Sequence, residues 1–491
     1  MVLLAERCDR LSGALVCLMA VFSPWAFGTT TPWAVQAMNV AGGLLGLLLA
    51  VKLVIRGVWG YRPARWDAAP DTGLPGMMAA RWLTRLLAAL TCLILAYTAI
   101  SAWNARSTYD PDTGTFLLHD HCPWLPHSYD GGRTWRYFWN YLALALTFWA
   151  ARDWLLGKTP NDLLAARKGR DSAFPGVRVP QRLRLLLWVL SLNGALIAGE
   201  ALVQRLSGTE KLLWLVRPRL NAMAEAQLGP FNYRSNGAQY LNLIWPVSLG
   251  LWWRLRRTAR LLYAHRGWLA RHKHHLLLPC VLLMAGTAVL SLSRGGALVA
   301  LLNMLAATAV LWAGWWHRSV WPRLGVLLFF GTAVGLGVLV SGAKLAERLE
   351  AADEGLLQRE QMFDTARAIA RDFPLFGTGP GTLDPVFQLY RRSPDEYWPA
   401  QLHNDWLETR VTFGWLGSGL IALAFLAVLA RYFLPGGVPT GWRLVLLYWV
   451  ALGGCLLHAR WDFPLQVYSI LFLFLLHCAA LTVLSRRTAV T

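Results

Sequence analysis

The sequence predicts an all-α, polytopic membrane protein with about twelve transmembrane helices and one large, partly helical external loop. The 491 residues are 56% apolar and only 15% charged, which is far from the balance of a soluble chain of this length. Runs of about 20 apolar residues, the length that a helix needs to cross a bilayer, also recur along the whole chain. We therefore treat residues 1–491 as a single membrane domain.

Each predicted helix is an apolar run bounded by polar or basic residues. The runs cover residues 11–28, 33–55, 82–102, 136–155, 185–203, 237–253, 276–292, 297–316, 324–341, 412–431, 443–459 and 465–484. The first run follows Arg7 and Arg10, as in a signal peptide, but it ends in Ser23-Pro24-Trp25 without a convincing cleavage site. We expect it to be retained as the first transmembrane helix.

The distribution of basic residues predicts the orientation. The formal net charge is +20, and with the N-terminus inside, the segments predicted to be cytoplasmic hold much of the Lys and Arg. In the short outside turns 29–32 and 293–296, the only charged residue is Arg294. This positive-inside pattern predicts both termini on the cytoplasmic side of the membrane. The basic residues then lie beside membrane lipids on the cytoplasmic side, which explains the positive net charge without a nucleic-acid partner.

The longest segment predicted to lie outside is the loop 342–411, which faces away from the cytoplasm. Its apolar residues recur at helical spacing, which predicts an amphipathic helix on the surface of the bundle or membrane; these residues are Met362, Phe363, Ala366, Ile369, Ala370 and Phe373. Pro374 is expected to end this helix, and Gly377–Gly381 marks an irregular turn. Two further outside segments, 103–135 and 204–236, are long enough to carry functional groups.

His403 is the first candidate for chemistry, because it lies where the loop enters the tenth apolar run. On a helical projection, Arg410, Gly414 and Gly417 fall within about 40° of His403. One face would then present an imidazole, a guanidinium and two positions where another helix or a substrate can approach closely. The alternative is an interfacial histidine beside ordinary packing glycines.

Two arginines are candidates for binding an anion. Arg294, in Ser291-Leu292-Ser293-Arg294-Gly295-Gly296, lies at the external membrane edge, where an unpaired charge is costly. Arg234 lies just ahead of the sixth run, and a guanidinium can bind phosphate oxygens in a bidentate manner. The alternatives are a snorkelling side chain for Arg294 and a simple loop exit for Arg234.

Three polar groups have weaker signals. The island 458–464 contains Arg460 and Asp462, which could simply pair with each other. Asp110-Pro111-Asp112 resembles an acidic metal-binding motif, and the His and Cys residues of 119–127 are potential zinc ligands. Neither group has a second ligand pair at diagnostic spacing, so we predict no metal and no cofactor.

The motifs resemble those of the O-antigen ligase and O-antigen polymerase superfamily. His403-Asn404, nine residues and then Gly414-Trp415-Leu416-Gly417 is similar to the motif of O-antigen ligases. The Ser-Arg-Gly-Gly turn at 293–296, the turn at 374–379 and the island ending in Asp462-Phe463 resemble the wider superfamily. The resemblance covers roughly residues 229–484.

The resemblance implies a membrane glycosyltransferase that needs no metal. It would move a glycan from undecaprenyl pyrophosphate to an acceptor sugar hydroxyl, such as one on lipid A-core, with inversion and at the periplasmic face. His403 matches the essential histidine of the family, Arg294 matches an arginine that binds the pyrophosphate, and Arg234 is a less motif-like match to a second such arginine. The supporting residues would be Asn404, Arg410, Gly414, Gly417 and Asp462.

Other functions fit part of the pattern. A polymerase that joins lipid-linked repeat units of an O-antigen or exopolysaccharide has overlapping motifs, and a protein O-oligosaccharyltransferase would differ only in its acceptor. A lipid-linked glycan transporter would need charges deep within several spans. The sequence has few such charges, and Glu200 stands near the end of its run.

Overall fold

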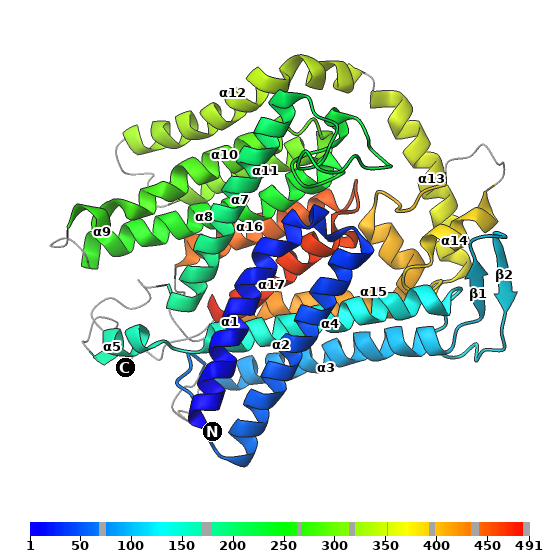
Figure 1. The fold of residues 1–491 in the computed structure, drawn as a ribbon, viewed down its shortest axis with the longest axis horizontal. Coiled ribbons are helices and arrows are strands. Elements are labelled where there is room, and N and C mark those ends of the chain that lie inside the picture. Colours follow the sequence, from blue (N-terminus) through cyan, green and yellow to red (C-terminus); the bar gives the residue numbers. More distant parts are fainter. Residues whose placement is uncertain are drawn as a thin grey trace.

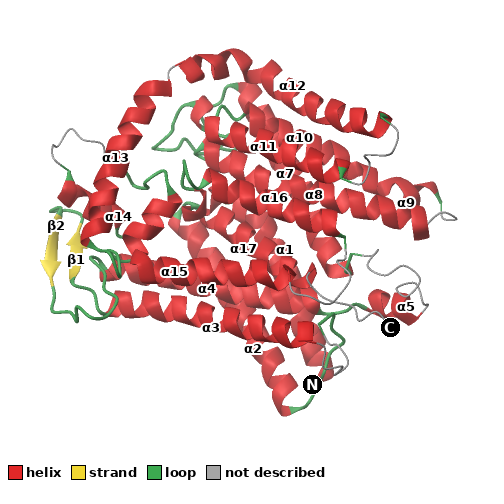
Figure 2. Cartoon of the chain, turned by 180° about the vertical axis from the view of Figure 1, so that it is seen from behind, coloured by secondary structure: helices red, strands yellow, loops and turns green. Residues whose placement is uncertain are grey.

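The computed structural model is a bundle of long helices, with its largest loops gathered at one end (Figure 1). It describes residues 1–67, 75–167, 179–262, 267–313, 320–350, 352–391, 398–433 and 441–484. In Figure 2, which views the bundle from behind, loops and two short strands again lie at one end. We call this end, formed by segments 103–135, 204–236 and 342–411, the loop end.

A helix lies over each apolar run that the sequence predicts. These helices are α1 (Val2–Trp25), α2 (Pro32–Val58), α3 (Pro75–Trp103), α4 (Gly131–Leu156), α7 (Gln181–Ser207), α8 (Arg234–Leu262), α10 (Leu277–Leu290), α11 (Arg294–Trp312), α12 (Trp321–Glu350), α15 (Asp405–Phe433), α16 (Trp442–His458) and α17 (Tyr468–Leu484). Within the described ranges, 6 helices are long and apolar enough to cross a membrane by length and composition. The chain is thus a helical membrane protein, and the number of twelve spans stays a prediction.

The core centres on α8, which packs against α7, α10, α11, α16 and α17. Its side chains Tyr240 and Trp245 are fully buried among those neighbours. A buried pair of hydroxyls, Ser191 Oγ and Ser248 Oγ at 2.7 Å, joins α7 to α8. Since the start of α8 reaches the loop end, this rigid core fixes the position of Arg234 and its neighbours.

The loop 342–411 is largely helical. The helix α12 continues to Glu350, and α13 (Ala352–Asp372) is the predicted amphipathic helix, which ends two residues before Pro374. Its apolar face is buried against α14 (Leu383–Phe387), Leu402 and Val411. The prediction of this helix is therefore confirmed, and its apolar face lies on the protein.

The second long loop contains the one sheet found in the described ranges, which the all-α prediction missed. Strands β1 (Ser107–Asp110) and β2 (Thr115–Leu118) pair antiparallel, with Tyr109 opposite Phe116. Asp110 accepts hydrogen bonds from Asp112 N (3.0 Å) and Thr113 Oγ1 (2.8 Å) in the connecting turn. The acidic motif of this loop is therefore a hairpin turn, and across the described ranges no three His, Cys, Asp or Glu side chains gather as metal ligands.

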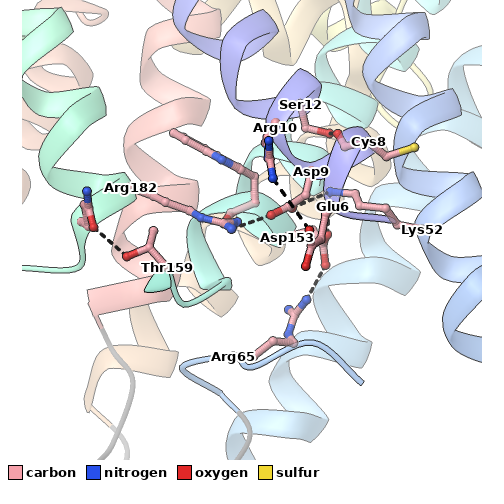
Figure 3. A network of polar contacts seen from close by, with 12 residues as sticks. Glu6, Cys8, Asp9, Arg10, Ser12, Lys52, Arg65, Asp153, Thr159 and Arg182 are labelled. Carbon is pink, nitrogen blue, oxygen red and sulfur yellow. Dashed lines mark hydrogen bonds and ion pairs between the residues drawn. The ribbon is translucent and has the colours of Figure 1, made fainter. Parts of the chain in front are cut away.

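An ion-pair network ties the helices together away from the loop end (Figure 3). Asp153 of α4 binds Lys52 (2.9 Å) and Arg56 (2.6 Å) of α2, and Arg65 (2.5 Å). Asp9 of α1 binds Lys52 (3.3 Å) and Arg182 of α7 (2.5 Å). Because the Lys52 side chain is only 1% exposed, these carboxylates compensate a charge that would be costly to bury alone. The short helices α5 (Pro160–Arg167) and α9 (Trp268–His272) lie at this end too.

Candidate functional site

His403 lies in a strained backbone position just before α15. Its φ is +54°, a left-handed conformation that non-glycine residues rarely adopt. Asn404 caps the helix that follows, since its Oδ1 accepts a hydrogen bond from Leu407 N at 3.1 Å. On the other side of His403, Leu402 N donates to Glu408 Oε2 at 2.9 Å. The strain is thus held in place from both sides.

The prediction that His403 shares a helical face with Arg410, Gly414 and Gly417 is wrong. The helix begins at Asp405, and its backbone is broken at Gly414, where φ is 60° and ψ is −167°. Angular spacing therefore cannot be counted from His403 through this segment.

The partner of His403 is Asp462. The imidazole Nδ1 lies 2.9 Å from Asp462 Oδ1, and the two side chains are 19% and 7% exposed. This contact fixes the orientation of the ring and leaves Nε2 as the nitrogen that can exchange protons with a substrate. The sequence alternative of an Arg460–Asp462 pair is wrong in the described residues, where the carboxylate contacts His403 instead.

A chain of hydrogen bonds runs from Asp462 into the neighbouring helices. Ser235 Oγ, at the start of α8, makes a short hydrogen bond to Asp462 Oδ2. Ser293 Oγ donates to Ser235 Oγ at 3.1 Å and accepts from Gly296 N at 3.0 Å, which caps α11. The Ser-Arg-Gly-Gly turn is therefore connected to His403 through two serines and one carboxylate.

The surroundings of Asp462 keep it ionised. Burial by itself raises the pKa of this carboxyl. The hydrogen bond from His403, the nearby His458 and the hydrogen bond from Ser235 outweigh burial, and together they lower the pKa to about 2. A negative charge therefore faces Nδ1 at neutral pH. It would stabilise the imidazolium that forms when Nε2 takes up a proton.

Aromatic rings enclose the imidazole. Tyr233 and Phe463 stack with ring centroids 5.4 Å apart, and the His403 ring meets Phe463 edge-on at 4.8 Å. The Tyr233 hydroxyl also lies 3.4 Å from Asp462 Oδ2. Our sequence reasoning missed Tyr233 and Ser235, although they flank Arg234 directly and are polar groups at the edge of an apolar run.

Both candidate arginines begin helices beside this chain of hydrogen bonds. Arg294 is the first residue of α11; its side chain is exposed and forms no ion pair or hydrogen bond with the part of the chain that the structure describes. A helix N-terminus with a guanidinium favours an anion. Arg234 is the first residue of α8, is half-buried, and donates from Nη1 to Glu225 O at 2.8 Å.

The turn after α13 fills the break in α15. Trp415 N donates to Pro374 O (2.9 Å) and Leu416 N to Leu375 O (3.1 Å), while Thr378 N donates to Val411 O at 2.9 Å. A Cβ on Gly414 would lie 2.3 Å from Leu375 O, so no larger residue fits. The nine residues between Asn404 and Gly414 are therefore one structural unit, a short helix that starts at its cap and ends at the break.

The other supporting residues hold this unit. Arg410 Nη1 donates to Pro374 O at 2.9 Å, and its guanidinium stacks 4.1 Å from the centre of the Trp415 ring. Gly417 leaves room for Tyr97 of α3, whose hydroxyl donates to Phe413 O (2.9 Å) at the break. Through these contacts Arg410 holds the turn after α13, and Gly417 lets Tyr97 pack at the break in α15.

Comparison with known proteins agrees with the resemblance. Residues 279–422 match the family model described as O-antigen ligase. The matched segment contains Arg294, His403 and Gly414, and it ends before Asp462. No curated protein matches the chain. This match over residues 279–422 supports a relationship of the chain to the O-antigen ligase superfamily.

Proposed function

We propose that this protein is a glycosyltransferase of the O-antigen ligase type. It moves a glycan from undecaprenyl pyrophosphate to a sugar hydroxyl of an acceptor such as lipid A-core, at the periplasmic face of the inner membrane. The observation that carries the proposal is the pair of His403 and the ionised Asp462, joined by Ser235 and Ser293 to a helix N-terminus that begins with Arg294.

His403 is the general base of the reaction. Its Nε2 takes the proton from the acceptor hydroxyl, and the oxygen attacks the anomeric carbon of the donor glycan. The bond from this carbon to the pyrophosphate oxygen breaks, and its electron pair leaves with the pyrophosphate. Attack from the side opposite the leaving group inverts the anomeric configuration. A positioned base of this kind contributes about 10²- to 10⁴-fold in rate.

The arginines act on the leaving group. Lipid pyrophosphate leaves readily once its growing negative charge is stabilised, and preorganised cations at a low-dielectric membrane edge do this without reorganisation of solvent. Arg294 and the α11 N-terminus bind the pyrophosphate, and Arg234 assists from the start of α8. The helices α13 and α14 cover the site and limit the access of water, which would otherwise compete as the acceptor.

The test is transfer by the purified protein in vesicles that contain the lipid-linked glycan and lipid A-core. We expect wild-type protein to form the product, and His403→Ala to lose about 10²- to 10⁴-fold in rate. His119→Ala is the matched control, because His119 is an exposed histidine of the loop end that contacts Thr108. Full activity of a well-folded His403→Ala protein would exclude the mechanism. If only a second lipid-linked glycan serves as acceptor, the protein is a polymerase.

A further inference from the structure

A cavity of about 920 Å³ opens at the loop end, beside the segment that carries His403. Its lining comes from the first half of α2, the first half of α4, the turn into α14, and Ala400, Gln401 and Glu408. His403, Arg294 and Arg234 are not among the lining residues, so this cavity is separate from the proposed pyrophosphate site. Its volume is that of a ligand pocket rather than of a packing defect.

The cavity is adjacent to the catalytic segment. Gln401, two residues before His403, lines it, and so does Glu408. The carboxylate of Glu408 accepts the hydrogen bond from Leu402 N that holds the backbone next to His403. A ligand in the cavity would therefore lie against the segment that positions the base.

The lining is rich in groups that both donate and accept hydrogen bonds. Four amide side chains, Gln36, Asn39, Asn140 and Gln401, contribute to it, together with the rings of Tyr137 and Trp139. Asn39 Nδ2 donates to Asn140 Oδ1 at 2.8 Å, and Tyr468 Oη donates to Asn39 Oδ1 at 3.0 Å, so this part of the wall is preorganised. A hydrocarbon chain would leave these amides unsatisfied, whereas sugar hydroxyls both donate and accept.

One guanidinium in the lining has no carboxylate partner within the described residues. Arg133 binds Asp384 (2.6 Å) and lies near Asp130 (3.4 Å). Arg136, one helical turn further along α4, is exposed and forms no ion pair in the described ranges. The cavity thus offers a single guanidinium to an anionic group.

We propose that this cavity binds the acceptor as the end of an oligosaccharide that carries one acidic group, a phosphate or a carboxylate. The amides bind the hydroxyls, Arg136 binds the acidic group, and the reacting hydroxyl extends past Gln401 toward His403. This inference rests on the proposed transfer reaction and adds the class of acceptor to it. The acceptor hydroxyl and the leaving pyrophosphate then lie on opposite sides of the anomeric carbon, as a direct displacement requires.

The kinetic test varies the concentration of acceptor. Arg136→Ala and Gln36→Ala should raise the KM for an acidic acceptor, about tenfold for the loss of the charged partner, with kcat nearly unchanged. Arg367→Ala is the matched control, since Arg367 is an exposed arginine of the loop end that pairs with Asp364 outside the cavity. An unchanged KM in both variants, beside an inactive His403→Ala protein, would overturn this inference and leave the transfer reaction standing.

A binding test works without turnover. The probes are a hexose trisaccharide that carries one phosphate and its neutral counterpart, titrated into wild type and Arg136→Ala protein in detergent. We expect the phosphorylated probe to bind wild type about tenfold more tightly than the variant, and the neutral probe to bind both alike. Absence of binding, equal binding of both probes to wild type, or preference for a Ser/Thr peptide would overturn the inference, whatever the result of the transfer assay.

Discussion

The two ends of the helix bundle treat charge in opposite ways. At one end, Asp153 contacts three cations, and Lys52 bridges Asp153 and Asp9. At the loop end, Asp462 contacts an imidazole and hydroxyls, and Arg294 has no carboxylate partner in the described ranges. The first arrangement satisfies its own charges, which is the sign of a structural network. The second leaves cationic capacity for an anion that comes from outside the chain.

The largest expected effect on stability comes from breaking the structural end. Asp153→Asn leaves Lys52, Arg56 and Arg65 without their shared carboxylate, which should cost about 3–5 kcal/mol in the free energy of unfolding. Thermal denaturation in detergent measures this, with Asp364→Asn as the control, because Asp364 is an exposed carboxylate paired with Arg367. Equal melting temperatures for the two variants would contradict a structural role.

Arg294→Ala tests the loop end. Removal of one preorganised donor to a developing charge typically costs about 10²- to 10³-fold in rate, and we expect a loss of this size with little change in melting temperature. Arg294→Lys should recover only part of the rate, because an ammonium binds pyrophosphate as a point charge. Wild-type transfer by Arg294→Ala would assign this arginine to snorkelling.

The break in α15 predicts a smaller effect. Gly414→Ala forces a side chain into a left-handed position and against the carbonyl of Leu375, so we expect a loss of about 1–3 kcal/mol in stability together with reduced transfer. Gly419→Ala is the matched control, since a Cβ there meets nothing within 4 Å. The difference in melting temperature between the two variants measures how much the break in α15 contributes to stability. Equal melting temperatures would show that the break is dispensable.

The smallest effect concerns pH. The pKa of Asp462 is lowered to about 2 from an ordinary value of 3.8, so the stability due to its charged form is complete above pH 3.8 and disappears as the pH falls through 2. Wild type should therefore lose about 2 kcal/mol on acidification that Asp462→Asn does not lose. Parallel melting curves of the two proteins between pH 5 and 2 would contradict the ionised Asp462.

Helix positions could be predicted from the sequence because long apolar runs depend on local composition alone. The same holds for α13, whose apolar residues recur at helical spacing up to Pro374. The β1–β2 hairpin was missed because its strands have four residues each, too short for a periodic signal. Local patterns thus determine the elements, and short elements depend on their tertiary contacts.

The geometry of the site could be predicted only in part. His403 and Arg294 stand out in the sequence, but the contact between His403 and Asp462 joins residues 59 positions apart and depends on how the helices pack. The sequence did contain a signal against placing His403 on the helix. Asn404 followed by Asp405 and Glu408 is typical of a helix start, which puts His403 before the helix. Gly414 looked like a packing residue, and only the contact with Leu375 explains why a glycine is required there.

We propose that the loop end performs the chemistry and that the opposite end holds the fold. The most direct measurement is the rate of glycan transfer per folded molecule for His403→Ala and Asp153→Asn in the same vesicles. We predict that His403→Ala melts like wild type and loses about 10²- to 10⁴-fold in rate, while Asp153→Asn melts earlier and keeps its rate. Loss of transfer in Asp153→Asn with normal transfer in His403→Ala would contradict the account.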